Sequence, residues 1–306
     1  MISKGRKQRS PAVVVYGPDG VGKTGFGAFT PNPIFIEAER GSDAYDVDRF
    51  DPSPKSFDEI IKHTEYLLNN EHSYQTLIYD SLDWIESLLH KKIIAQYSAK
   101  NIAAAAGGFG RGYLEAADRF RDLIELVDKL RDDKKMNVIF ICHAQSKTFN
   151  DPEHQATYER FGLKLDDRAN AVFREYVDAV LFMNYQVFVK TEDGNAKGQA
   201  YGTGDRLIHV ERKPGFDAKN RYGLHEPINY IERQGWNDFF SQIKSVNTEP
   251  SEVILSRIAS LLEFVPKDTL PKVHETIALA GNDSVKLMTI EKRLNEIAKM
   301  EREIKK

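Results

Sequence analysis

The stretch that decides the fold is "VVVYGPDGVGKTGF", residues 13–26. Three valines and a tyrosine form a short apolar run, and such runs without polar alternation are typical of strands buried on both faces of a parallel sheet. The run enters a glycine-rich turn that ends in Lys23 and Thr24. This spacing satisfies the phosphate-loop pattern G-x-x-x-x-G-K-[ST] directly after a predicted strand, which is the context that the motif requires. The sequence therefore predicts an α/β protein that binds a nucleotide.

The loop supplies several groups that can hold ATP and Mg²⁺. Its glycines let backbone N–H groups turn toward phosphate oxygens, and the following helix presents its positive end. We expect the Lys23 ammonium to reach the β and γ phosphates and the Thr24 hydroxyl to hold Mg²⁺. The predicted nucleotide-binding residues are Gly17, Pro18, Asp19, Gly20, Val21, Gly22, Lys23, Thr24 and Gly25.

A third apolar run, "TLIYD" at 76–80, ends in an aspartate. A carboxylate at that point of a neighbouring strand is suited to complete the Mg²⁺ site with Thr24, so Asp80 is the second predicted metal ligand. The alternative is that Asp80 caps the next helix, which Ser81 could do equally well.

The second run, "PIFIEAE" at 33–39, ends in two glutamates. Glu37 and Glu39 would share one face of a strand, because side chains alternate along it. Either carboxylate could orient the water that attacks the γ phosphate, and solvated strand-end acids are the alternative.

The order of the elements predicts a doubly wound sheet with the site outside the carboxyl ends of its strands. A fourth buried run, "NVIFICHAQ" at 137–145, follows the first three. Helical spacing of apolar residues predicts three intervening helices, the first of them capped by Ser56. The predicted strands are 12–16, 33–39, 76–80 and 137–145, and the predicted helices are about 56–70, 82–105 and 113–131.

The pattern changes after residue 150. Apolar runs at 177–190 and 205–213 flank the glycine-rich "EDGNAKGQAYGTGD", which indicates antiparallel strands and hairpins added to the sheet. A linker-like break at 246–252 precedes segments of helical periodicity. We predict two domains: an ATPase core at 1–245 with a short basic N-terminal tail, and a helical domain at 250–306.

Composition excludes several classes of protein. No apolar run approaches the roughly 18 residues that would suggest a membrane span, and the N-terminus lacks the apolar segment of a secretory signal. The single cysteine, Cys142, fits a reducing cytoplasm. The net charge of −3 creates no global positive field, so any nucleic-acid site must be local.

One glycine-rich segment has the residue types of such a local site. "AAAAGGFGRGY", 103–113, carries Phe109, Arg111 and Tyr113, and aromatic rings beside a cation are what sequence-tolerant binding of a single strand needs. The basic tail with Lys4, Arg6, Lys7 and Arg9 could add phosphate contacts. A connection that packs its own aromatic side chains is the alternative for 103–113.

Four motifs together resemble a known group. "VVVYGPDGVGKT", "IFIEAERG", "TLIYDSLDWIE" and "VIFICHAQ" follow the order and approximate spacing of RecA-like ATPase cores, including the KaiC and replicative-helicase branch. The match is closer to phage RecA-like single-strand annealing ATPases and covers about residues 10–240. The resemblance implies a RecA-like P-loop core with a mainly parallel sheet, an antiparallel hairpin extension and a small C-terminal helical region.

The resemblance also implies roles for individual residues. It selects Glu39 as the residue that acts on the attacking water, and it makes His143 or Gln145 at the end of the fourth strand a sensor of the γ phosphate. In several branches a Lys-x-Arg pair from the neighbouring subunit contacts the γ phosphate, and Lys219 and Arg221 have that form here. An exposed basic turn, with Arg212 and Lys213 nearby, is the alternative.

The function that the resemblance implies is ATP-dependent binding and annealing or pairing of single-stranded DNA by a homo-oligomeric ring or filament, in the cytoplasm of a bacterial host. Phe109 and Arg111 would lie in the first DNA-binding loop, and Lys147 in a second segment at 146–169, which lacks the usual glycines. A connection that packs its own aromatic side chains is the alternative for 146–169 as well. A single-strand-binding protein is a further expected partner, and a membrane is not. The alternatives are a helicase-type motor, a small-molecule phosphotransferase with 107–112 as its lid, and a nucleotide-gated assembly module.

Overall fold

The computed structural model describes residues 9–150, 157–190, 199–247, 251–266, 269–281 and 284–304. It contains two compact units, Met1–Asp238 and Phe239–Lys306, and helix α6 (Gly235–Asn247) crosses the boundary between them. Each unit is described by itself.

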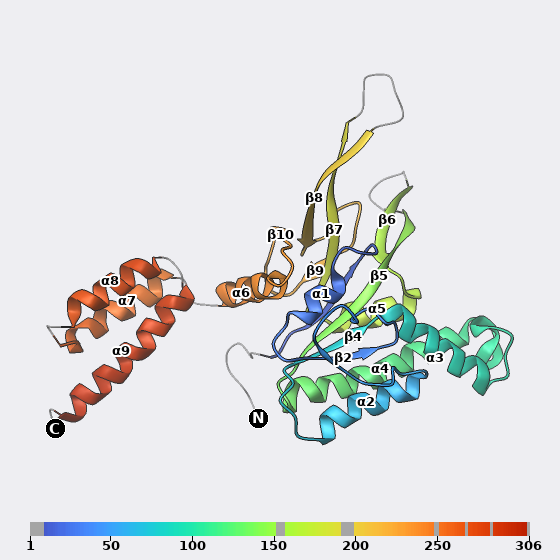
Figure 1. Cartoon of the computed structure of the whole chain (residues 1–306), viewed down its shortest axis with the longest axis horizontal. Coiled ribbons are helices and arrows are strands. Elements are labelled where there is room, and N and C mark those ends of the chain that lie inside the picture. Colours follow the sequence, from blue (N-terminus) through green and yellow to red (C-terminus); the bar gives the residue numbers. More distant parts are fainter. Residues whose placement is uncertain are drawn as a thin grey trace. The chain divides into compact units, whose positions relative to one another are not determined.

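The first unit is built on a twisted sheet, to which ten strands of the described chain belong (Figure 1). Strand β1 lies between β5 and β7 and runs parallel to both, and the parallel pairing continues from β5 through β4 and β2 to β3. The parallel strands are β1 (Ala12–Gly17), β2 (Pro33–Glu37), β3 (Asp48–Arg49), β4 (Thr76–Asp80), β5 (Asn137–Asn150) and β7 (Ala179–Lys190). All six residues of β1 are buried, as expected for an apolar run without alternation.

Antiparallel strands extend this sheet. Strand β7 continues past the parallel region and pairs with β8 (Gln199–His209), while β5 continues into a hairpin with β6 (Thr157–Leu163). Two short strands, β9 (Lys219–Asn220) and β10 (Ile228–Asn229), pair with β7 and β8. The predicted fold class, a mainly parallel RecA-like core with an antiparallel hairpin extension, is confirmed.

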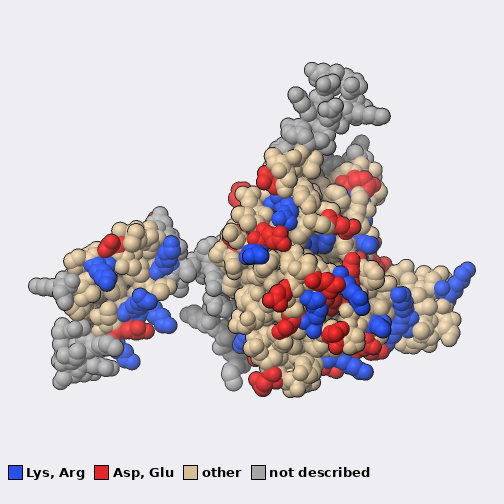
Figure 2. Space-filling model, viewed as in Figure 1, with Lys and Arg blue, Asp and Glu red and all other residues tan. Residues whose placement is uncertain are grey.

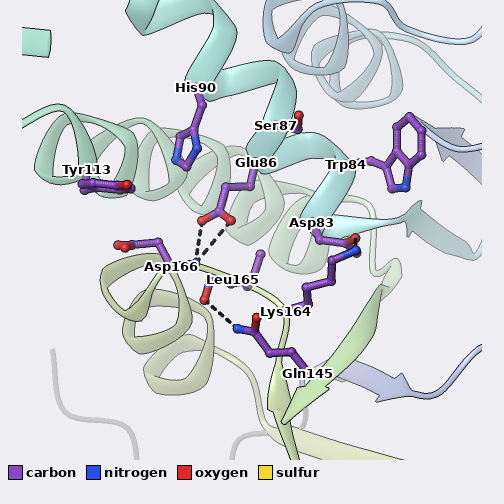
Figure 3. Close-up of a pocket in the computed structure, with 10 residues that line it drawn as sticks. All are labelled: Asp83, Trp84, Glu86, Ser87, His90, Tyr113, Gln145, Lys164, Leu165 and Asp166. Carbon is purple, nitrogen blue, oxygen red and sulfur yellow. Dashed lines mark hydrogen bonds and ion pairs between the residues drawn. The ribbon is translucent and has the colours of Figure 1, made fainter. Parts of the chain in front are cut away.

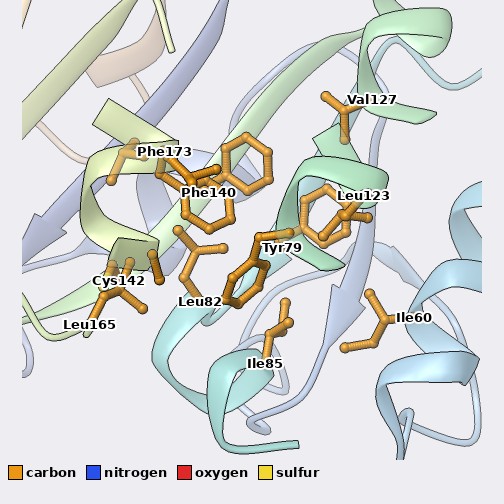
Figure 4. Packing of buried hydrophobic residues seen from close by; sticks show 14 of the residues in the cluster. Ile60, Tyr79, Leu82, Ile85, Leu123, Val127, Phe140, Cys142, Leu165 and Phe173 are labelled. Carbon is orange, nitrogen blue, oxygen red and sulfur yellow. The ribbon is translucent and has the colours of Figure 1, made fainter. Parts of the chain in front are cut away.

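Helices cover both faces of the sheet. The main core lies beneath α2, α3, α4 and α5, whose apolar side chains surround Tyr79 and Phe140 of the sheet (Figure 4). On the other face, α1 (Lys23–Ala28) packs so closely that a Cβ at Gly27 would lie 3.1 Å from Ile78. The helices over the main core are α2 (Phe57–Asn69), α3 (Leu82–Gln96), α4 (Arg111–Asp133) and α5 (Asp167–Tyr176). Each fully buried aliphatic side chain contributes about 1.5–3 kcal/mol to the stability of this core.

Local chemistry explains where α2 begins and where α3 ends. The Ser56 hydroxyl accepts the backbone N–H of Glu59, so the predicted cap of α2 is confirmed. The predicted helix at 82–105 is wrong in its second half, since α3 ends at Gln96 and Ser98 has a positive φ of 46°. A separate 3₁₀ helix, η1 (Ile102–Gly107), begins behind the side-chain cap of Asn101.

Two strands differ in length from the prediction. Strand β2 ends at Glu37, two residues early, because the chain turns so that the N–H groups of Ala38 and Glu39 both bond the carbonyl of Asp80. Strand β5 continues to Asn150, because residues 144–150 pair with 157–163. The predicted second DNA-binding segment is therefore a hairpin followed by α5, with 151–156 outside the described residues.

The second unit contains α7 (Ser251–Leu261), η2 (Leu262–Phe264), α8 (Leu270–Ala280) and α9 (Ser284–Ile304). Ile254 and Ile258 of α7 and Leu287 and Leu294 of α9 form the centre of its small core. Across the described ranges, no helix has the length and apolar character needed to cross a membrane.

Candidate nucleotide-binding site

The phosphate loop connects β1 to α1 and depends on its glycines. Gly20 and Gly22 have positive φ values of 73° and 104°, and a Cβ at Gly17 would lie 2.2 Å from the carbonyl oxygen of Met183. Lys23 begins α1 and is 6% exposed, and burial lowers the pKa of its ammonium. Its Nζ donates to the carbonyls of Gly17 and Pro18 at 3.0 and 2.9 Å. The ammonium thus lies at the loop, where phosphate oxygens can replace the two carbonyls as acceptors.

Thr24 and Asp80 meet at the carboxyl ends of β1 and β4. The Thr24 hydroxyl donates to Asp80 Oδ2 at 2.9 Å. Burial raises the pKa of Asp80 to about 7, although the bond from Thr24 opposes the rise. These two oxygens fit Mg²⁺, which commonly takes one or two protein ligands and completes its shell with phosphate and water. Asp80 accepts a hydrogen bond from Thr24 of α1, and the N-cap of α3 is Ser81, so the alternative that Asp80 only caps α3 is wrong.

A glycine keeps this pair of oxygens accessible. A Cβ at Gly41 would lie 3.0 Å from Asp80 Oδ2 and 3.2 Å from Thr24 Oγ1. The sequence analysis did not identify Gly41. Its position shortly after the two strand-end glutamates could have marked it as part of the site. Among the described residues, no group of three or more His, Cys, Asp or Glu side chains could hold a metal ion by itself.

The two glutamates occupy different surroundings. Glu37 is 2% exposed, and its carboxylate accepts the N–H of Ser42 at 2.9 Å. Glu39 lies beyond the end of β2, is 35% exposed at its side chain, and accepts the Ser81 hydroxyl at 3.3 Å. The expectation that both share a strand face is wrong, because the strand ends between them. Glu39 is the more accessible of the two carboxylates.

His143 joins this group and Gln145 does not. Nδ1 of His143 lies 3.0 Å from both carboxylate oxygens of Asp83, and this bond raises the pKa of the imidazole. The other nitrogen, Nε2, lies 3.5 Å from Asp19 of the phosphate loop and 3.8 Å from Glu39.

The Gln145 amide instead donates to the carbonyls of Leu163 and Leu165 at 3.1 and 3.4 Å. Of the two predicted sensors, only His143 faces the phosphate loop. Sequence reasoning also missed Asp83, which orients that histidine.

Lys219 and Arg221 lie at the opposite end of the parallel strands. Arg221 is 3.6 Å from the carboxylate of Asp178, which itself accepts the N–H of Ala12 at the start of β1. Burial and the neighbouring Arg221 lower the pKa of Lys219 to about 8. The structure does not bring this pair to the phosphate loop of the same chain, so any contact with a γ phosphate requires a second subunit.

The predicted DNA-binding residues are placed differently from one another. Gly107, Gly108, Phe109 and Gly110 all have positive φ, and Phe109 is 97% exposed at the tip of the loop before α4. Arg111 follows as the first, exposed residue of α4. Backbone strain around an exposed ring is a feature that functional loops often carry.

Lys147 and Arg9 are paired with other residues of the same chain. The Lys147 ammonium donates to the carbonyl of Leu165 at 3.1 Å and pairs with Asp167 at 2.7 Å. Arg9 pairs with Asp128 and Asp132 of α4. The other basic residues of the tail, Lys4, Arg6 and Lys7, lie outside the described residues.

Three side chains from the hairpin extension hold the phosphate loop, and none was foreseen from the sequence. Tyr185 and Tyr230 donate their hydroxyls to the carbonyls of Gly20 and Gly22 at 2.9 and 3.0 Å, and Arg206 donates to that of Val21 at 3.3 Å. These donors come from β7, β8 and the segment after β10. The extension therefore fixes the shape of the loop.

A pocket of about 510 Å³ opens beside α1. Its lining includes Phe29, Tyr45, Glu232 and Arg233, with the Arg233 guanidinium 5.4 Å from the centre of the Phe29 ring. The Tyr45 hydroxyl would lie 2.9 Å from a Cβ at Gly25, so the pocket borders the phosphate-loop helix. Its aromatic faces could hold the base of a bound nucleotide.

The parallel sheet, the strand-to-helix phosphate loop and the Thr24–Asp80 pair together define a P-loop nucleotide-binding protein. A family model described as an AAA domain matches residues 9–222, and the chain belongs to this family of P-loop ATPases. No curated protein matches the chain.

Proposed function

We propose that this protein is an ATP-dependent single-stranded DNA-binding protein of the phage RecA-like annealing type, which promotes annealing or pairing of strands and hydrolyses Mg-ATP at an interface between subunits. The observation that carries the proposal is an exposed, cationic segment without acidic residues, 91–112, which α3 connects to the strand end at Asp80. The protein would act in the cytoplasm of a bacterial host, with a single-strand-binding protein as a further partner.

The residues at the phosphate loop divide the work of hydrolysis. Bound Mg²⁺ would be held by Thr24 and Asp80 and would supply positive charge to the phosphates. Lys23 adds a second cation. Glu39 is the carboxylate that can orient and deprotonate the attacking water, because it is accessible where Glu37 is buried and bonded.

His143 can report the state of the nucleotide. Its Nε2 faces the phosphate loop, while its Nδ1 is hydrogen-bonded to Asp83 of α3. Loss of a bond between Nε2 and the terminal phosphate would therefore change the hydrogen bonding of a side chain that contacts α3.

The DNA-binding surface is supported by charge and exposure. Residues 91–112 contain four cations and no aspartate or glutamate, although the chain as a whole is acidic. Lys91, Lys100 and Arg111 of this segment are exposed, as is Phe109 at the tip. Figure 2 shows Lys and Arg mixed with Asp and Glu over the centre of the first unit, and Lys and Arg among uncharged residues on the lobe formed by the end of α3 and η1. Cations with an exposed ring suit a flexible, unstacked strand.

Assembly completes the proposal. The Lys219–Arg221 pair lies at the amino ends of the strands, away from the phosphate loop of its own chain. In a ring or filament, these cations can stabilise the charge that develops on a neighbour's γ phosphate, which makes hydrolysis depend on assembly.

The test combines DNA binding with turnover. Anisotropy of a labelled oligodeoxythymidylate, with a nonhydrolysable ATP analogue present, should report binding, and unlabelled strand should stimulate ATP hydrolysis. Phe109→Ala should weaken binding about tenfold through lost stacking, while the exposed Tyr66→Ala on α2 should not. A protein that neither binds the strand nor changes its turnover would refute the proposal. Unwinding of a duplex would favour the helicase-type motor, phosphate transfer to a small acceptor would favour the phosphotransferase, and nucleotide-dependent assembly without DNA would favour the assembly module.

A further inference from the structure

A second pocket lies on the other side of His143 and Asp83 from the phosphate loop. It has a volume of about 540 Å³, within the range of small-ligand sites. Its walls come from α3, the start of α4, β5 and the connection between β6 and α5 (Figure 3). We call this site the base pocket; its lining residues are Asp83, Trp84, Glu86, Ser87, His90, Tyr113, Gln145, Lys164, Leu165 and Asp166.

One face of helix α3 lines the pocket with polar residues. Asp83, Glu86, Ser87 and His90 recur at the i, i+3, i+4 and i+7 spacing that places side chains on one side of a helix. The apolar stripe of α3, which includes Ile85 and Leu89, packs into the main core instead. The polar face therefore has no role in packing the core.

The floor of the pocket is formed by the buried polar side chains of Glu86 and His90, and the carboxylates of Asp83 and Asp166 also line the site. Glu86 is 8% exposed and accepts the N–H of Asp166 at 3.0 and 3.2 Å. Burial raises its pKa to about 7, with the Asp166 bond opposing the rise, while burial lowers the pKa of His90. His90 Nε2 is buried and has no hydrogen-bond partner among the described residues. A ligand edge that both donates and accepts hydrogen bonds would satisfy these groups.

Aromatic and cationic side chains line the rim. Trp84 is 48% exposed on one side, and Tyr113 stands on the other with its ring 5.6 Å from that of His90 (Figure 3). Lys164 is 54% exposed at the rim, and Arg168 lies over the Tyr113 ring at 5.8 Å. Two cations thus lie at the rim, and each has a carboxylate near it: Lys164 lies 3.4 Å from Asp83, and Arg168 lies 3.9 Å from Asp166.

We propose that this pocket holds an unstacked base of the single strand, with the base beside Tyr113, its hydrogen-bonding edge toward Glu86 and His90, its phosphate toward Lys164, and the adjoining strand passing Trp84 at the rim. The inference rests on the proposed function and names where that strand inserts a base. The rim residues Trp84 and Lys164 are exposed, and Tyr113 of the lining follows Arg111 by two residues in α4, which suits one unit of a chain better than an enclosed small molecule.

The position of the pocket links it to the nucleotide. Asp83 accepts from His143 on one side and lies 3.4 Å from Lys164 on the other. A phosphate that draws Lys164 away from Asp83 would change the partner that orients His143. The same carboxylate thus faces both the ATPase site and the base pocket.

Tryptophan fluorescence tests the pocket directly, because the chain has two tryptophans and only one lies here. Trp236 is 2% exposed and packs against Phe26, so it serves as the internal reference. The protein with a nonhydrolysable ATP analogue is titrated with oligodeoxythymidylate and with an abasic strand of equal length. We expect the thymidylate strand to quench emission, the abasic strand not to, and Trp84→Phe to abolish the change.

Binding measured by anisotropy separates the two proposals. His90→Ala and Trp84→Ala should each weaken the thymidylate strand about tenfold and leave the abasic strand unchanged, with Tyr66→Ala as control. Binding without quenching, equal quenching by the abasic strand, or wild-type affinity of both variants would overturn the pocket and leave the proposed function standing. No binding of any strand would overturn the proposed function itself, and phosphorylation of free thymidine monophosphate would assign the pocket to a small acceptor.

Discussion

The phosphate site and the base pocket lie on either side of one histidine–aspartate pair and are built in contrasting ways. Each contains a buried acid, Asp80 in the phosphate site and Glu86 in the base pocket. Burial raises the pKa of both carboxyl groups to about 7. Asp80 meets the hydroxyl of Thr24, and Glu86 meets a backbone N–H. The first pair is suited to a metal ion, which would take the place of the hydrogen bond between its two oxygens, whereas the second is suited to a ligand that forms hydrogen bonds.

The sites also differ in how far apart their residues lie in the chain. Eight consecutive residues build most of the phosphate site, while the base pocket needs side chains from residue 83 to residue 166. A backbone loop can be recognised as a spacing of glycines, but a pocket between helices exists only after the helices pack. The polar residues of α3 can therefore be recognised as part of a site only when the elements packed beside them are known.

Removal of the Lys23 ammonium should break the phosphate site most completely. Lys23→Ala should reduce ATP turnover by at least about 100-fold, because a preorganised cation at the phosphates is lost. Steady-state ATPase rates and binding of a fluorescent nucleotide measure the effect, with the exposed Lys62→Ala on α2 as control. Emission of Trp84 without ligand should not change, and normal turnover would remove Lys23 from the site.

Arg221 tests whether the phosphate site is complete within one chain. Arg221→Ala should reduce turnover by about 100-fold or more if this guanidinium acts on a neighbour's γ phosphate. A mixture of Arg221→Ala and Lys23→Ala protein should recover part of the activity at mixed interfaces, whereas Arg121→Ala, on the outer face of α4, should match the wild type. A mixture with no recovery at saturating concentrations would count against action in trans.

Separate replacement of Glu37 and Glu39 by glutamine tests which of them activates the water. Glu39→Gln should reduce turnover about 100-fold while nucleotide affinity stays within about twofold, because only proton transfer is lost. Glu37→Gln should be much milder, since an amide oxygen can still accept the N–H of Ser42. Rapid-quench measurement of a single turnover separates hydrolysis from binding, and the reverse ranking would move the role to Glu37.

Gly41 separates the metal site from the rest of the phosphate site. Gly41→Ala places a Cβ about 3 Å from Asp80 and Thr24, so the Mg²⁺ concentration for half-maximal turnover should rise roughly several-fold. Gly215→Ala, where no atom lies within 4 Å, is the matched control. An unchanged Mg²⁺ dependence would show that these oxygens do not hold the metal.

The smallest expected effect concerns the pair that joins the two sites. Burial raises the pKa of Asp83, but the bonds from His143 outweigh it and lower the pKa to about 2, while the pKa of His143 is raised. The ion pair therefore stabilises the fold above pH 3.8, where unfolded aspartate is ionised, and this contribution is lost as the pH falls toward 2. At the upper limit the titrating group is His143: its raised pKa keeps the contribution complete up to about pH 6.5, the value of an unfolded histidine. The contribution declines as the pH rises through the folded pKa of His143.

Asp83→Asn should accordingly cost on the order of 1 kcal/mol of unfolding free energy between these limits and less above them. Urea unfolding of the nucleotide-free protein at several pH values measures the difference. Asp118→Asn, on the exposed face of α4, is the control. A cost that does not depend on pH would mean that Asp83 acts by packing alone.

Local sequence could predict the sheet and the phosphate loop, because buried strands and glycine turns leave short, dense patterns. It could not predict the break after Gln96, where Ser98 adopts a positive φ and Asn101 caps a new turn. Nor could it separate Glu37 from Glu39 without a resemblance, since that difference depends on β2 ending where its chain turns toward Asp80.

What the sequence by itself determined is the phosphate loop, the placing of Thr24 with Asp80, and the α/β class, because each depends on contiguous residues and strand ends. Only the tertiary structure decided that His143 and not Gln145 faces the loop, that Tyr185, Arg206 and Tyr230 hold it, and that Trp84 and His90 open onto a pocket. These contacts join residues far apart in the chain, and their geometry is set by how helices pack on the sheet and where each strand stops.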